Sequence, residues 1–250
     1  MFVSDFMLSN SYHSLQARVD RRFRRYGRIT AAYTLSKSLD YADAFSLDDD
    51  LNIDNNRGPS IFDRKHNLVV SHVARLPFGR GEKLFDSNGL RWKGLLGGFT
   101  LSGVFTARSG TPVDIGNVNL ITDPATGRSN RPLGATARPN VTGTPRILGG
   151  LGPGQLFFDT SVFRDPLPGQ TGNAGRNSLR GPSFFNYNAT LSRTFSLTEQ
   201  FKLQFQATAF NVTNTPHFRN PSGDFTSSTF GESRTTFGAR SIRFGLKLTF

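Results

Sequence analysis

Residues 238–250, GARSIRFGLKLTF, show the strict alternation of apolar and polar side chains that decides the fold. The apolar positions are Ile242, Phe244, Leu246, Leu248 and Phe250. The positions between them are Ser241, Arg243, Gly245, Lys247 and Thr249. A period of two over this length predicts a β-strand whose two faces meet different solvents. The length also suits a tilted strand that crosses a membrane, which needs about 9–11 residues.

The preceding periodic segment, FKLQFQATAFN at residues 201–211, repeats the pattern. Its polar face carries Lys202, Gln204 and Gln206, and the opposite face carries Phe201, Leu203 and Phe205. We therefore expect a water-filled lumen beside one set of side chains: Lys202, Gln204, Gln206, Arg243 and Lys247. We expect lipid beside the other: Ile242, Phe244, Leu246, Leu248 and Phe250. A soluble β-sandwich also alternates, because its inner faces are packed and its outer faces are wet.

The composition favours strands and turns over helices. Of the 250 residues, 24 are Phe and 26 are Gly, and only 36% are hydrophobic. The mean hydropathy is −0.36, and no run approaches the ~18 apolar residues of a transmembrane helix. Barrel strands are compatible with this result, since their hydropathy signal is weak. The absence of cysteine excludes disulfides and thiolate metal sites.

The net charge of +12 raises the question of a partner. Clustered Lys and Arg would indicate nucleic acid, because they neutralise phosphates. Here the basic residues recur singly inside alternating segments, as Lys202, Arg243 and Lys247 do. A wet lumen and anionic lipid head groups explain that spacing better, so we expect no nucleic-acid partner.

Seven segments of the chain are predicted to be strands. They are residues 11–24, 28–39, 66–76, 93–108, 184–195, 200–211 and 238–250. The facing of 66–76 stays open, because its apolar residues fall on both faces. We expect an all-β, antiparallel up-and-down meander over residues 1–250, forming an incomplete segment of a large transmembrane β-barrel with long external loops.

The lengths of the connections support a meander. Short connections at 24–28, 77–90 and 196–200 alternate with long ones at 40–63, 109–182 and 212–236. In a meander, alternate connections emerge at the same end of the sheet, so all the long ones should lie together. Outer-membrane barrels have short periplasmic turns and long external loops.

Motifs for chemistry are weak. The four histidines, His13, His66, His72 and His217, lack close ligand spacing, and no nucleophile-elbow motif occurs. Asp50, Asn52 and Asp54 begin like a calcium loop, but Asn55 and Ile61 stand where such a loop needs Gly and Glu. Weak calcium binding by Asp48–Asp50 stays an alternative. We expect no enzymatic activity, no cofactor and no metal site.

Several stretches resemble one family. They are SYHSLQARVDRRF (11–23), FDRKHNLVVSHVARLPFG (62–79), GFTLSGVFTARSGTPVDI (98–115), GNAGRNSLRGPSFFNYNATLSRTF (172–195), FQATAFNVTNTPHF (205–218) and RFGLKLTF (243–250). Together they resemble the C-terminal barrel portion of TonB-dependent outer-membrane receptors of Gram-negative bacteria. The similarity is to the Oar-like receptors that carry a carboxypeptidase-regulatory-like domain.

The resemblance implies a barrel of about 22 strands around a plug. It implies uptake of an unidentified ligand, coupled indirectly to the TonB system. The N-terminal barrel strands and the plug of the same receptor would be partners. Membrane lipid would be another, as would the barrel-assembly machinery, which would recognise the strand ending at Phe250. The opening residues MFVSDFMLSN lack a secretory signal, so we expect the chain to begin partway through a longer one.

Two other functions fit parts of the sequence. A self-contained small outer-membrane barrel or adhesin would not transport, although an odd number of strands argues against closure, since single-chain bacterial barrels are even. A soluble basic β-rich nucleic-acid-binding protein is favoured only by the charge.

Overall fold

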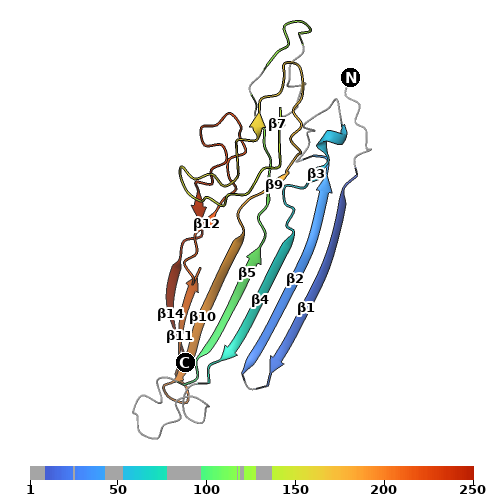
Figure 1. The fold of residues 1–250 in the computed structure, drawn as a ribbon. Coiled ribbons are helices and arrows are strands. Elements are labelled where there is room, and N and C mark those ends of the chain that lie inside the picture. The colour runs from blue at the N-terminus through green and yellow to red at the C-terminus, as the bar shows by residue number, and fades with distance from the viewer. Residues whose placement is uncertain are drawn as a thin grey trace.

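One antiparallel sheet of long strands dominates the molecule (Figure 1). The computed structural model describes residues 9–24, 26–42, 53–77, 97–116, 118, 121–127 and 137–250. The long strands are β1 (Ser11–Phe23), β2 (Gly27–Asp40), β4 (His66–Arg75), β5 (Thr100–Arg108), β10 (Phe184–Ser196), β11 (Lys202–Phe210) and β14 (Ser241–Thr249). They pair in the order β1-β2-β4-β5-β10-β11-β14, and the short β3 (Gly58–Pro59) pairs with β2. The predicted all-β meander is confirmed.

Strand boundaries differ from the predictions at several ends. β5 begins at Thr100 rather than at residue 93; residues 97–99 are outside the strand, and 93–96 lie outside the described residues. β14 begins at Ser241 rather than at 238. Gly27, assigned to the turn by sequence, opens β2. Its φ of 135° and the close approach of the Val73 carbonyl oxygen, which a Cβ atom would overlap, require glycine there.

Between residues 202–208 and the terminal strand, the pairing register keeps apolar side chains on one face and polar side chains on the other. Leu203 lies opposite Leu248 and Phe205 opposite Leu246, whereas Gln204 lies opposite Lys247. We call the two surfaces of the sheet the apolar face and the polar face. Because directly opposed residues share a face, the alternation of one strand extends across its neighbours.

The register also decides the facing of β4, which its own sequence left open. Val70 lies opposite Ala31 of β2 and Phe105 of β5, so it belongs to the apolar face. Leu68, His72 and Ala74 share that face by the period of two, while Asn67, Val69, Ser71 and Val73 belong to the polar face.

The sheet is open at both edges. β1 and β14 occupy its two ends, and no pairing joins them among the described residues. The prediction that the strand near Ser11 forms no complete ladder with the terminal strand is confirmed.

The long connections gather at one end of the sheet (Figure 1). Arg176 of the connection 109–182 forms an ion pair with Asp40, at the start of the connection 40–63. Gly116 and Leu156 form β-bridges with Asp224 and Glu232 of the connection 212–236. The short turns after β1 and β10 lie at the other end. The predicted clustering is confirmed, although most of 77–90 lies outside the described residues.

The described parts of 109–182 and 212–236 form a compact unit that we call the cap. Short strands that sequence analysis did not predict pair within it: β6 (Pro112–Val113) with β9 (Leu179–Arg180), β7 (Asn140–Val141) with β8 (Phe163–Arg164), and β12 (His217–Phe218) with β13 (Thr236–Phe237). Two-residue strands are too short to produce a visible period.

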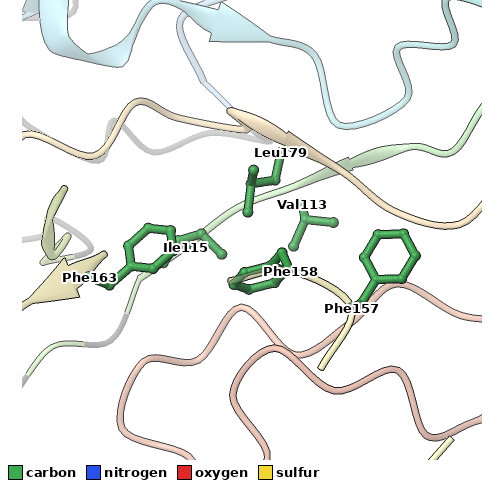
Figure 2. Close-up of a cluster of buried hydrophobic side chains, with 6 residues drawn as sticks. All are labelled: Val113, Ile115, Phe157, Phe158, Phe163 and Leu179. Atoms are coloured by element: carbon green, nitrogen blue, oxygen red, sulfur yellow. The ribbon is translucent and has the colours of Figure 1, made fainter. Parts of the chain in front are cut away.

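The cap holds the hydrophobic core of the described structure. Its buried cluster, drawn in Figure 2, consists of Val113, Ile115, Phe157, Phe158, Phe163 and Leu179. The rings of Phe158, Phe163 and Phe230 meet edge to face, with centroids 5.4–5.9 Å apart. Such aromatic pairs each contribute roughly 0.5–1.5 kcal/mol beyond their buried area. Among the described residues no helix is long and apolar enough to span a membrane.

Candidate ligand-binding site on the polar face

The residues predicted to line a lumen lie together on the polar face. Lys202, Gln204 and Gln206 of β11 share that face with Arg243 and Lys247 of β14, and Gln204 is directly opposite Lys247. The guanidinium of Arg243 lies 5.3 Å from the centroid of the Phe210 ring. The structure thus brings these five side chains together, and contact with water in a lumen stays a prediction.

The residues predicted to meet lipid lie on the apolar face of β14. They are Ile242, Phe244, Leu246, Leu248 and Phe250, with exposed fractions of 51–90%. Phe244 packs near Phe205, with ring centroids 6.4 Å apart, and Phe250 lies 6.5 Å from Phe201. So large an exposed apolar surface requires a cover. That the cover is lipid stays a prediction.

A row of side chains crosses the polar face at the end nearest the cap, and sequence analysis missed it. Opposed residues in successive strands are Gln16, Thr34, Asn67, Arg108 and Phe184. The row forms part of the lining of two adjoining pockets, which share Arg64 and Arg108.

The first of these, the arginine pocket, has a volume of about 590 Å³ and lies between the sheet and the cap. It is lined by Arg64, Arg108, Thr111, Pro182, Phe184, Phe218, Arg219, Asn220 and Phe237. These residues come from the connections between β2 and β4, between β5 and β10 and between β11 and β14, and from the ends of β5 and β10. The periodicity of the sequence could not predict this pocket, because its residues are distant in sequence and only folding brings them together.

The charge of the arginine pocket is entirely positive, because its lining includes Arg64, Arg108 and Arg219 and no acidic residue. Within the described part of the chain, none of the three forms an ion pair. Partial burial lowers the pKa of Arg64, and the nearby charge of Arg108 lowers it further. Both effects disfavour a charged guanidinium, so an anion in this pocket would be stabilised.

The second pocket, of about 440 Å³, is rich in hydroxyl groups and contains one carboxylate beside the two shared arginines. Besides the shared arginines its lining is Tyr12, Gln16, Thr34, Ser36, Ser38, Phe62, Asp63 and Asn67. The carboxylate of Asp63 accepts a hydrogen bond of 2.6 Å from the Ser38 backbone N–H and forms an ion pair with Arg180. It is therefore engaged by the protein itself.

Two arginines of the cap form ion pairs with carboxylates outside it, one at the end of β2 and one in the connection before β4. The buried side chain of Arg176 pairs with Asp40 and donates to the Asn56 carbonyl at 2.8 Å. Arg180 pairs with Asp63. Burial lowers the pKa of Arg176, and the ion pair with Asp40 offsets this cost. This docking holds the pocket walls in position.

Two histidines of β4 form hydrogen bonds with tyrosines of other strands. His66 hydrogen-bonds Tyr33, and His72 hydrogen-bonds Tyr187, each at 2.8 Å. No group of three metal-ligating side chains occurs within the described ranges. Asp48–Asp50 lie outside the described residues, and the expected lack of metal, cofactor and catalysis stays a prediction.

Long strands with one polar and one apolar face, joined as a meander with every long connection at one end, define an outer-membrane β-barrel protein. The family model described as an outer membrane beta barrel domain matches residues 3–243, so the chain belongs to this family. No curated protein and no solved structure matches the chain significantly. The protein is located in the outer membrane.

Proposed function

We propose that this chain forms part of the wall, the lumen lining and the external capture surface of a TonB-dependent outer-membrane receptor. The observation that carries the proposal is the position of the cap: it folds over the end of the polar face, and a pocket opens between them. Uptake needs a capture site that leads into a wet passage. The receptor would bind and pass its ligand, with energy from the inner membrane, and would break no covalent bond.

The open edges support a larger barrel. Within the described residues, β1 and β14 each present a row of unpaired backbone groups, which natural proteins cover or pair. Further strands and a plug from the same receptor would supply the partners and fill the lumen. Lipid would cover the apolar face, and the assembly machinery would recognise the terminal strand.

An adhesin or small barrel without transport is the competing function. The compact cap favours it, because a rigid surface at one end of a barrel also suits attachment. The soluble nucleic-acid-binding alternative loses its support, since the family is one of the outer membrane.

The test compares three strains of the source bacterium: the wild type, a deletion of this protein and an inactivated TonB. Compounds that disappear from a defined mixture of peptides, carbohydrates and metal chelates are measured by mass spectrometry of the medium. We expect the same compound to remain in both mutant cultures and to disappear again when the gene is restored. Depletion that needs this protein but not TonB would reject TonB-dependent uptake.

A further inference from the structure

We propose that the arginine pocket binds an oxyanion, a carboxylate or phosphate, carried on a flat apolar body. The inference rests on the proposed receptor function, because it names the chemical class of the captured ligand. Arg108 and Arg219 are its anion contacts, and the rings of Phe184 and Phe237 are its apolar wall.

The donors of the pocket arginines are only partly used. Arg108 donates from Nε to Asn67 Oδ1 at 3.1 Å, and Arg64 donates from Nη1 to the Ser109 carbonyl at 2.9 Å. The Arg219 side chain makes no hydrogen bond within the described structure; its guanidinium lies 5.8 Å from the Phe237 ring centroid. Each guanidinium has five N–H donors, so several remain for a ligand. The planar fork fits carboxylate and phosphate oxygens in pairs.

The neutral polar groups of the pocket are already engaged. Thr111 donates to Asn220 Oδ1 at 3.1 Å, and Asn220 Nδ2 donates to the Pro112 carbonyl at 2.8 Å. These bonds leave the arginines as the main polar contacts for a ligand. A neutral hydroxylated molecule would therefore gain less here than an anion.

The aromatic wall is fixed before any ligand arrives. The rings of Phe184 and Phe237 are parallel within 1°, with centroids 6.1 Å apart. His217, which is buried, lies 4.4 Å from Phe184 and is held by a hydrogen bond of 2.6 Å between its Nε2 and the Phe185 carbonyl oxygen. Phe237 is 43% exposed beside a polar face. An exposed ring held in this way offers a stacking surface for a flat group.

The backbone beneath the pocket is packed too closely to collapse into it. The Gly181 N–H donates to the Thr111 carbonyl at 2.9 Å. A Cβ atom on Gly181 would overlap Asn220 Oδ1, and one on Gly110 would overlap the Gly181 carbonyl. Glycine at these two positions allows the connections to meet, so the arginines are supported at fixed positions.

The experiment measures binding of phenyl phosphate to the full-length protein in a neutral detergent, with the dissociation constant taken from saturation-transfer NMR titrations. Phenol and inorganic phosphate are the matched half-ligands. We expect Arg108→Gln and Arg219→Gln each to weaken binding about tenfold, as for loss of a charge-assisted hydrogen bond. Phe237→Ala should weaken binding of phenyl phosphate and leave inorganic phosphate unchanged.

Lys247→Gln is the control, because it removes one positive charge from the same face at the opposite end of β14. Unchanged binding in this variant supports a site local to the arginine pocket. A loss as large as that of the Arg108 and Arg219 variants would overturn the proposal, because the overall positive charge of the polar face would then explain binding. Failure of the wild type to bind, or phenol binding as tightly as phenyl phosphate, would also overturn it. Heat modifiability on gels confirms that each variant is folded. The strain comparison described above is an independent test. Uptake can prove independent of TonB while this pocket still binds phenyl phosphate, and the pocket can fail to bind while uptake still depends on TonB.

Discussion

Single residues on β14 test which solvent each face meets. Leu246 lies opposite Phe205 near the middle of the strand, on the apolar face, whereas Thr249 lies opposite Lys202 on the polar face. Both side chains are exposed, so neither is fixed by packing in the described sheet. Replacing each by lysine therefore compares two solvents with little change in side-chain contacts.

We expect Leu246→Lys to reduce the folded fraction strongly and Thr249→Lys to reduce it little. A lysine at the bilayer midplane costs about 2–4 kcal/mol, and less near the interfaces. The measurement is the heat-modifiable fraction in outer-membrane preparations. Equal tolerance of the two lysines would show that the faces meet the same solvent and would contradict the lipid-facing assignment.

The ion pair between Arg176 and Asp40 holds the cap against the end of β2. Arg176→Gln leaves Asp40 without its buried ion pair, a change that typically costs about 3–5 kcal/mol. We expect the cap to become sensitive to limited proteolysis at protease levels that spare the wild type. Arg240→Gln removes an exposed arginine at the same end of the molecule and serves as the control. A resistant Arg176→Gln cap would mean that the core of Figure 2 holds it unaided.

At the scale of the element, β14 is an edge strand of the described sheet, and we predict that it also crosses the membrane. Its partner β11 covers one side, and its other side is unpaired among the described residues. Phe250, which directly follows β14, is 90% exposed, and Phe244 within the strand is 74% exposed. Removing either ring deletes a similar number of packing contacts. A larger loss of insertion for one of them would therefore indicate a role beyond packing.

We expect deletion of Phe250 to reduce insertion into the outer membrane more than Phe244→Ala does. The reason is that the terminal aromatic would be read by the barrel-assembly machinery and would anchor the strand at the interface. The measurement is the amount of folded protein in outer-membrane fractions at equal synthesis. If both variants lose a similar amount of folded protein, Phe250 contributes no more to insertion than an ordinary apolar side chain.

At the scale of the whole molecule, the sheet formed by the described residues has two unpaired edges and an uncovered apolar face. Such edges template association with other chains, and such a face needs lipid or detergent. We expect residues 1–250, expressed alone, to aggregate without detergent. The measurement is sedimentation and size-exclusion chromatography with and without a neutral detergent. A monodisperse soluble monomer would contradict the open-barrel interpretation.

Sequence alone determined the long strands, their order and the end at which the long connections lie. The physical reason is that a strand between two solvents must alternate at every second residue, as 201–211 and 241–249 do, so the pattern is local and readable. The residues of β11 and β14 assigned to the polar face could be predicted for the same reason.

Only the tertiary structure decided the facing of β4, the core of the cap and the arginine pocket. Val69 and Val70 are both apolar, so the sequence does not show which of them lies on the apolar face. Their cross-strand partners assign Val70 to that face and Val69 to the other. Arg64 lies in the connection between β2 and β4, Arg108 at the end of β5, and Arg219 in the connection between β11 and β14. They meet because the meander returns these segments to the same end. The periodicity of a segment predicts only its local structure. It cannot predict which distant segments come together, because that depends on the pairing of strands far apart in the sequence.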